Sequence, residues 1–222
     1  VLSEILSLFH ALQYSAILAA WLVSLLLLTL ALFWGLRRYG VGKFNPALAA
    51  ITDFEFYLLT ATLAIILVVG LAGLIYPPNN VDSMTYHMSR VMHWMQNGSL
   101  DFYPTANLRQ LHQSPWAEYA IVHLQILNGG GDLFANFIQW LCMAGSIIGA
   151  SLIAAELGAA RRGQVFAAAV CATLPMGILE GSTNQTDAVV AVWLVCFVYF
   201  VLRLRKQPNW LNATGAGLAL GL

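Results

Sequence analysis

Charged residues are scarce in this chain: 222 residues contain 9% Asp, Glu, Lys and Arg, whereas a soluble globular domain carries roughly a quarter. Ten basic residues balance ten acidic ones, which excludes both the basic excess of a nucleic-acid-binding protein and an acidic disordered tail. The three cysteines, Cys142, Cys171 and Cys196, lie in apolar runs without C-x-x-C spacing. This pattern is typical of small core residues and argues against a disulfide framework or a zinc site.

Hydrophobic residues are abundant instead, at 59% of the chain. Uncharged apolar stretches of about twenty residues predict membrane-spanning helices, because a helix rises 1.5 Å per residue and the hydrocarbon core is roughly 30 Å thick. The predicted spans cover residues 11–36, 56–76, 133–157, 164–179 and 188–202, and a sixth begins at 210. The fourth and fifth are short, and Pro175 is expected to kink or end the fourth. We therefore expect an all-α polytopic membrane protein with about five to six transmembrane helices.

The chain opens with Val1 and stops at Leu222, inside an apolar run that has barely started. We expect residues 1–222 to be the N-terminal part of one membrane-embedded domain whose C-terminal remainder follows.

Basic residues cluster after alternate spans, and short loops rich in Lys and Arg stay in the cytoplasm. The clusters are Arg37, Arg38 and Lys43, then Arg161 and Arg162, then Arg203, Arg205 and Lys206. Alternating topology places all of them on one side, which is predicted to be cytoplasmic. The same topology places the long loop 77–132 and the short segment 180–187 on the outer side. A loop as long as 77–132 is typically functional.

The first half of the outer loop predicts an amphipathic helix over residues 82–97, ended by Gly98 at its C-terminal cap. One face carries Met84, Met88, Val91, Met92 and Met95, and the opposite face carries Asp82, Tyr86, Ser89 and His93, with Arg90 at the border. We expect this helix to lie in the membrane interface with its methionines toward lipid and Trp94 at the headgroup level.

The second half of the loop predicts a short helix over residues 116–127, closed by the glycines at 129–131. Twelve residues are too few to cross a bilayer, so this helix is expected to be interfacial or re-entrant. The segment 180–187 precedes the fifth span, where Thr186 or Asp187 is expected to cap the helix.

The outer loop contains, in order, Pro77-Pro78-Asn79-Asn80-Val81-Asp82-Ser83-Met84-Thr85-Tyr86-His87, then Trp94, Asn97-Gly98-Ser99, Tyr103-Pro104-Thr105, Arg109-Gln110 and Ser114-Pro115. With Asn184-Gln185-Thr186-Asp187, these strings resemble bacterial glycosyltransferases of the GT-C class, in the branch that includes protein O-mannosyltransferases and the lipid A aminoarabinose transferase. The resemblance implies a GT-C-like fold in the bacterial plasma (inner) membrane. It also implies an enzyme that moves a sugar from a polyprenyl-phosphate carrier to a lipid, glycan or protein acceptor at the outer, periplasmic face.

The resemblance implies that Asp82, just after a span, is the catalytic base or a metal ligand, and that Asp187 is a second acidic site residue. Arg90 and Arg109 are the cations of the loop and are expected to bind the carrier phosphate, since the guanidinium fork suits phosphate oxygens. Further candidates for the pocket are Tyr86, His87, His112 and Glu118.

The aminoarabinose branch has an acidic residue and a lysine before a proline pair, whereas this chain has His112-Gln113-Ser114-Pro115. A divalent metal held by Asp82 and His112 is therefore an open expectation. The expected partners are a polyprenyl-phosphate-linked sugar, membrane lipids and an acceptor, with no nucleic acid.

Simpler interpretations exist for each residue. Asp82 and Asp187 are also candidates for helix N-caps alone, and His87 and His93 for hydrogen-bonded interfacial histidines. Arg90 and Arg109 could pair with Asp82 or Asp101 or bind lipid headgroups, while Glu118 and Glu180 read as solvated or capping carboxylates. The alternative functions are a multi-spanning transporter and a non-catalytic subunit that binds the lipid carrier.

Overall fold

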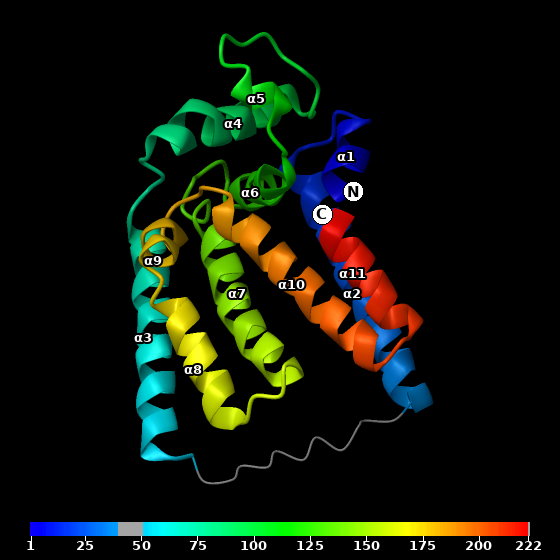
Figure 1. Cartoon of the computed structure of the whole chain (residues 1–222). Coiled ribbons are helices and arrows are strands. Elements are labelled where there is room, and N and C mark those ends of the chain that lie inside the picture. Colours follow the sequence, from blue (N-terminus) through cyan, green and yellow to red (C-terminus); the bar gives the residue numbers. More distant parts are fainter. Residues whose placement is uncertain (40–50, 222) are drawn as a thin grey trace.

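A computed structural model describes residues 1–39 and 51–221, and within these ranges the chain is helical and has no strand. Four helices have the length and apolar composition to cross a membrane: α2 (Tyr14–Tyr39), α3 (Asp53–Ile75), α7 (Phe137–Glu156) and α10 (Asp187–Lys206). A bent pair of helices raises the number to five if it forms one span. The chain is an all-α polytopic membrane protein, as predicted (Figure 1).

The bent pair occupies the place of the fourth predicted span. Its parts are α8 (Arg161–Ala172) and α9 (Pro175–Gly181), which meet at an angle of 63°. Leu174 is extended, with ψ 120°, and Pro175 opens α9. A proline lacks the N–H that would continue the preceding helix, and it disfavours helical backbone in the residue before it. The prediction that Pro175 ends or kinks this helix is confirmed.

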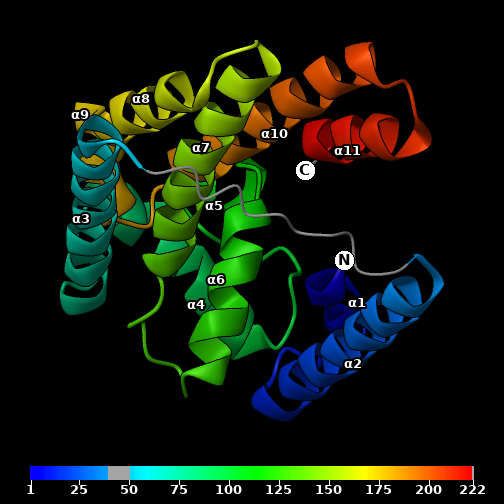
Figure 2. The same cartoon turned by 90° about the horizontal axis from the view of Figure 1, so that it is seen from below.

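The helices of the bundle pack most closely around α7, which contacts α8 on one side and α10 on the other. Buried apolar side chains of α3, α7 and α8 meet there, namely Val69, Met143, Ile147, Ala168 and Ala172. Small residues allow the close approach: a Cβ atom added at Gly149 would lie 2.1 Å from Cγ1 of Val195 on α10. The last helix, α11 (Trp210–Gly221), turns back along α10. Figure 2 shows the bundle from below.

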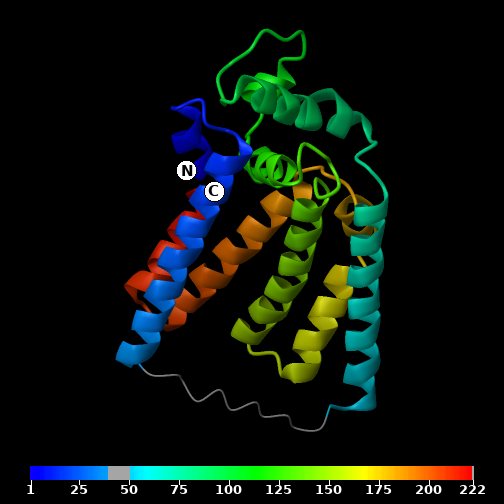
Figure 3. The ribbon, with the colours of Figure 1, turned by 180° about the vertical axis from the view of Figure 1, so that it is seen from behind.

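The described residues of the three basic clusters lie at one end of the bundle. Arg37 and Arg38 close α2, Arg161 opens α8 and Lys206 ends α10, and Figures 1 and 3 place these helix ends at the same side. Ion pairs join helices there, with Arg161 Nη2 2.8 Å from Oε2 of Glu55. Lys43, also predicted for this side, lies outside the described residues.

Short helices cover the opposite end, for which we keep the name outer end from the predicted topology. They are α1 (Leu2–Ser7), the π-helix η1 (Ser83–His87), α4 (Met88–Asn97), α5 (Arg109–His112) and α6 (Trp116–Leu127). The bounds of α6 are those predicted, and Gly98 ends α4 in the left-handed conformation with φ 64°, also as predicted. In Figure 1, α6 lies across the outer ends of α7 and α10, and α4 lies above α6.

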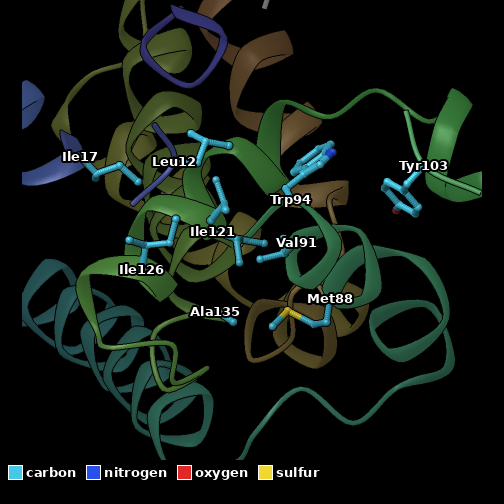
Figure 4. Close-up of a cluster of buried hydrophobic side chains, with 10 residues drawn as sticks. Leu12, Ile17, Met88, Val91, Trp94, Tyr103, Ile121, Ile126 and Ala135 are labelled. Carbon is cyan, nitrogen blue, oxygen red and sulfur yellow. The ribbon is translucent and has the colours of Figure 1, made fainter. Parts of the chain in front are cut away.

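The orientation predicted for the methionine-rich helix is wrong. Its apolar face packs on α6, where Met88, Val91 and Trp94 are buried against Ile121 and its neighbours (Figure 4). Met84 and Met92 are exposed instead, and Trp94 lies in this core and not at a headgroup level. The π-turn explains part of the difference, because a turn with i→i+5 hydrogen bonds holds an extra residue and rotates the residues before it relative to those after it.

Candidate functional site at the outer end of the bundle

The first outer helix is capped by Asn80 and not by Asp82. The backbone N–H of Ser83 donates to Oδ1 of Asn80 at 2.7 Å, and the Asp82 side chain makes no capping hydrogen bond. Asp82 therefore has no role as a side-chain cap. Its carboxylate instead pairs with Arg109, whose Nη1 lies 3.5 Å from Oδ1, with 39% of the Asp82 side chain and 59% of the Arg109 side chain exposed.

Tyr86 lies beside this ion pair. It follows Asp82 by one turn, and the Arg109 guanidinium lies 5.8 Å from the centre of its ring. Burial raises the pKa of the Tyr86 hydroxyl, and the negative charges of Asp82, Glu118 and Asp187 act in the same direction. The charges of Asp82, Arg109 and Asp187 thus all act on the pKa of the Tyr86 hydroxyl. Thr186 occupies the N-cap position of α10, as predicted, and Asp187 stands in the first turn. Neither side chain makes a capping hydrogen bond.

Three buried residues form a second charged group beneath the first. His87 Nδ1 lies 2.7 Å from Oε1 of Glu118, and Arg90 Nη1 lies 3.3 Å from the same oxygen. Glu118 is fully buried, and Arg90 and His87 are 1% and 2% exposed. The expectation that Glu118 is a solvated or capping carboxylate is wrong, because the helix face that carries it packs beneath η1 and α4.

Arg90 serves the structure of the loop and is not placed to bind a phosphate. Its Nη2 donates to the carbonyl oxygen of Arg109 at 2.7 Å, and its Nη1 donates to that of Gln113 at 3.1 Å. The guanidinium therefore connects α4, α5 and α6. We therefore correct the prediction that Arg90 contacts the carrier phosphate. The helical pattern puts Arg90 at the border of the polar face, and in the structure α6 covers this border.

A cavity of about 260 Å³ lies beside Tyr86 and His87. Its remaining walls come from the start of α6, the first turns of α10 and the end of α11, with polar groups from Gln113, Ser114 and Thr186. Trp116 and Trp193 meet edge to face in the wall at 5.3 Å between ring centres. Three apolar wall residues, Val190, Leu194 and Leu220, are also exposed on the bundle surface. The cavity thus joins a polar end at the outer loop to an apolar side of the bundle.

A second cavity of about 250 Å³ lies on the other side of Gln113 and Ser114, which line both. Asp101, Phe102, Tyr103, Gln110 and His112 contribute to it. His112 is exposed, with Nδ1 2.8 Å from the carbonyl oxygen of Leu108. His112 therefore borders this second cavity and not the one lined by Tyr86 and His87. His93 stacks on Tyr103 at 4.0 Å between ring centres, in keeping with the structural interpretation of this histidine.

Within residues 1–39 and 51–221, no group of three or more His, Cys, Asp or Glu side chains is placed to hold a metal ion. A metal bound by Asp82 and His112 stays a prediction. The described cysteines are free thiols, as predicted.

Several site residues received no role of their own from the sequence. Asn184, 1% exposed, accepts a hydrogen bond from the hydroxyl of Ser83 and so holds the segment before α10 against η1. Gln113 and Ser114 line both cavities, and Trp193 lies on a helix that otherwise reads as lipid-facing. Asn184 and Ser114 stand in the strings that carry the resemblance, but for Trp193 the signal was an aromatic residue within an apolar stretch, which is too common to indicate a site.

No known family, curated protein or solved structure matches the chain.

Proposed function

We propose that this protein is a membrane glycosyltransferase that moves a sugar from a polyprenyl-phosphate carrier to an acceptor at the face formed by α4, α5 and α6. The observation that carries the proposal is the cavity beside Tyr86 and His87. Its apolar walls continue to the bundle surface. Arg109 does not line the cavity, but its guanidinium is partly exposed and lies 5.8 Å from the ring centre of Tyr86, which does. A lipid with an anionic headgroup matches this combination, and the resemblance described above specifies a phosphosugar.

Arg109 is the proposed phosphate ligand. Its side chain is accessible, and Asp82 holds it from one side. When the glycosidic bond to the phosphate breaks, negative charge develops on the leaving phosphate, and a fixed guanidinium stabilises that charge. Asp82 then acts by orienting Arg109, and Asp187, from α10, supplies a second carboxylate to the same environment. Arg109 alone is thus proposed for the phosphate contact that the sequence predicted for both Arg90 and Arg109.

The second cavity is the proposed approach for the acceptor. It offers the carboxylate of Asp101, the amide of Gln110 and the exposed ring of Phe102, a set that suits a hydroxyl- or amine-bearing lipid, glycan or protein. Gln113 and Ser114 line both cavities, so an acceptor in the second cavity would extend its reacting group past this short segment into the first.

A non-catalytic subunit that binds the lipid carrier is the second candidate, because the guanidinium of Arg90 is occupied by the carbonyl oxygens of Arg109 and Gln113 and so holds the loop together. A transporter has less support: in α2, α3, α7 and α10 the ionisable residues stand near the helix ends, whereas transport sites lie near the bilayer midplane.

The test uses the full chain in liposomes with a panel of polyprenyl phosphates that carry a radiolabelled hexose, N-acetylhexosamine or aminopentose. The glycosyltransferase proposal predicts release of free polyprenyl phosphate together with transfer of label to an acceptor fraction from the cell envelope. Saturable carrier binding without turnover of any donor would identify the binding subunit, and absence of both binding and turnover would overturn the proposal.

A further inference from the structure

We propose that His87 is the general base of this site, and that its Nε2 atom takes the proton from the acceptor's hydroxyl or amine. This inference rests on the proposed function and assigns a role that the resemblance does not give to His87. Three features carry it: the hydrogen bond at Nδ1, the place of His87 in the cavity wall with Nε2 unpartnered among the described residues, and the burial of the carboxylate that orients the ring.

The hydrogen bond to Glu118 fixes the tautomer. An ionised carboxylate only accepts hydrogen bonds, so the contact at 2.7 Å places a proton on Nδ1. In the neutral ring, Nε2 is then the acceptor, which is the state that a base requires. Among the described residues, no hydrogen-bond partner occupies Nε2, and the ring forms part of the cavity wall.

Glu118 is itself held in place. Arg90 donates to the oxygen that His87 contacts, and Glu118 has no exposed surface. The ring of Tyr86 covers His87 at 4.0 Å between ring centres. The groups that face His87 are thus Glu118 from α6, Arg90 from α4 and Tyr86 from its own helix. A buried carboxylate at this distance stabilises the imidazolium that forms when Nε2 takes a proton.

In the proposed reaction His87 accepts the proton and Arg109 stabilises the leaving phosphate. The acceptor oxygen loses its proton to Nε2 of His87 and forms a bond to the anomeric carbon of the donor sugar. The bond between that carbon and the phosphate oxygen breaks, and its electron pair leaves with the polyprenyl phosphate beside Arg109. His87 then returns its proton to water or to the released phosphate. Asp82, already paired with Arg109, is left as the positioning residue for that cation.

Two substitutions test the roles of Nδ1 and Nε2 of His87 separately. In His87→Asn the amide nitrogen can replace Nδ1 and keep the contact to Glu118, whereas in His87→Gln the amide reaches the position of Nε2. Neither amide can accept a proton at neutral pH, so both variants are expected to lose transfer by about 100-fold or more. Crosslinking of a photoreactive polyprenyl phosphate should stay within about twofold of wild type, because Arg109 and the wall residues other than His87 are unchanged. In His87→Ala, added imidazole should restore part of the lost rate.

Other outcomes overturn the inference, and they differ from one another. Wild-type turnover by His87→Asn would mean that only the contact to Glu118 matters, and wild-type turnover by His87→Gln would mean that Nε2 only hydrogen-bonds. Loss of carrier crosslinking in both variants, without rescue of His87→Ala by imidazole, would show a structural role. In each of these cases wild-type transfer persists and the proposed function stands; if wild type transfers no sugar, both proposals fall together.

Discussion

The Asn80 side chain accepts the hydrogen bond of the Ser83 backbone N–H, which leaves the neighbouring Asp82 carboxylate available to Arg109. Two polar residues two positions apart therefore have separate tasks. The amide caps the start of η1, and the carboxylate pairs with a cation beside Tyr86.

Replacement of Asp82 by Asn should lower sugar transfer by up to about 100-fold, because a guanidinium displaced by even about 1 Å no longer meets the developing charge. Stability should change by less than about 1 kcal/mol, since exposed ion pairs contribute little. Transfer assays and thermal unfolding of the same preparations measure both effects. Asp132→Asn, an exposed carboxylate of the same loop, is the matched control, and full activity of Asp82→Asn would refute the role of Asp82.

The buried group around Glu118 should dominate the stability of the outer end. Glu118→Gln or Arg90→Met leaves one charge buried without its partner, and each is expected to cost about 3–5 kcal/mol. The double variant Glu118→Gln/Arg90→Met should lose less than the sum of the two, because neither charge remains. Denaturant unfolding in detergent gives these values. Arg109→Met, with 59% of the side chain exposed in wild type, serves as the control and should differ from wild type by less than about 1 kcal/mol.

Filling the apolar part of the cavity should block the carrier. Leu194→Trp adds a bulky ring to the wall that runs along α10, and binding of a photoreactive polyprenyl phosphate is expected to fall by about tenfold or more. Val198→Trp, one turn further along α10 and exposed but outside the cavity, should leave binding near wild type. Equal effects of the two substitutions would count against this cavity as the carrier site.

His123 should make folding sensitive to acid. Its side chain is buried in α6, where Ser3 lies 3.1 Å from Nε2 and Trp21 Nε1 donates to Nδ1 at 3.2 Å. Burial lowers the pKa of His123 below its usual 6.5, so below that pH the unfolded chain binds more protons than the folded one. The contribution of His123 to stability is therefore complete above about pH 6.5 and decreases as the pH falls toward the folded pKa.

Unfolding temperatures measured between pH 8 and pH 5 test this expectation. Wild type should lose stability across the interval, and His123→Gln, which cannot take up a proton, should lose less. The comparison with His93→Gln, a stacked histidine for which no such burial is found, isolates the effect of His123. A pH dependence unchanged in His123→Gln would contradict the assignment.

The membrane helices and the helix 116–127 were predictable because their signals are local: length of an apolar run, a proline at a break, glycines at an end. The pairing of Arg109 with Asp82 was one of the alternatives considered for this arginine. The sequence did not favour it over pairing with Asp101, because the two residues lie far apart in the chain.

The burial of Arg90 and Glu118 was not predictable in the same way. A helical wheel reports which residues share a face but not which face another helix covers, and here α6 covers the border that carries Arg90. The π-turn at Ser83–His87 adds a residue to the first turn and shifts Met84 away from Met88, an irregularity with no marker in the sequence. His87 became a candidate base only once its partner, thirty-one positions away in the chain, was in place.

The hydrogen bonds from Arg90 to the carbonyl groups of Arg109 and Gln113 have a consequence for sugar selection. They anchor the partition between the two cavities before any ligand arrives, so binding costs little ordering of the chain. Because this partition is held in place, it selects among donor sugars by the size of the space beside it. Substitutions that change the side-chain size of Gln113 or Ser114 should therefore alter the preference among donor sugars most. Changes in the length of the loop that leads to these residues should alter it little.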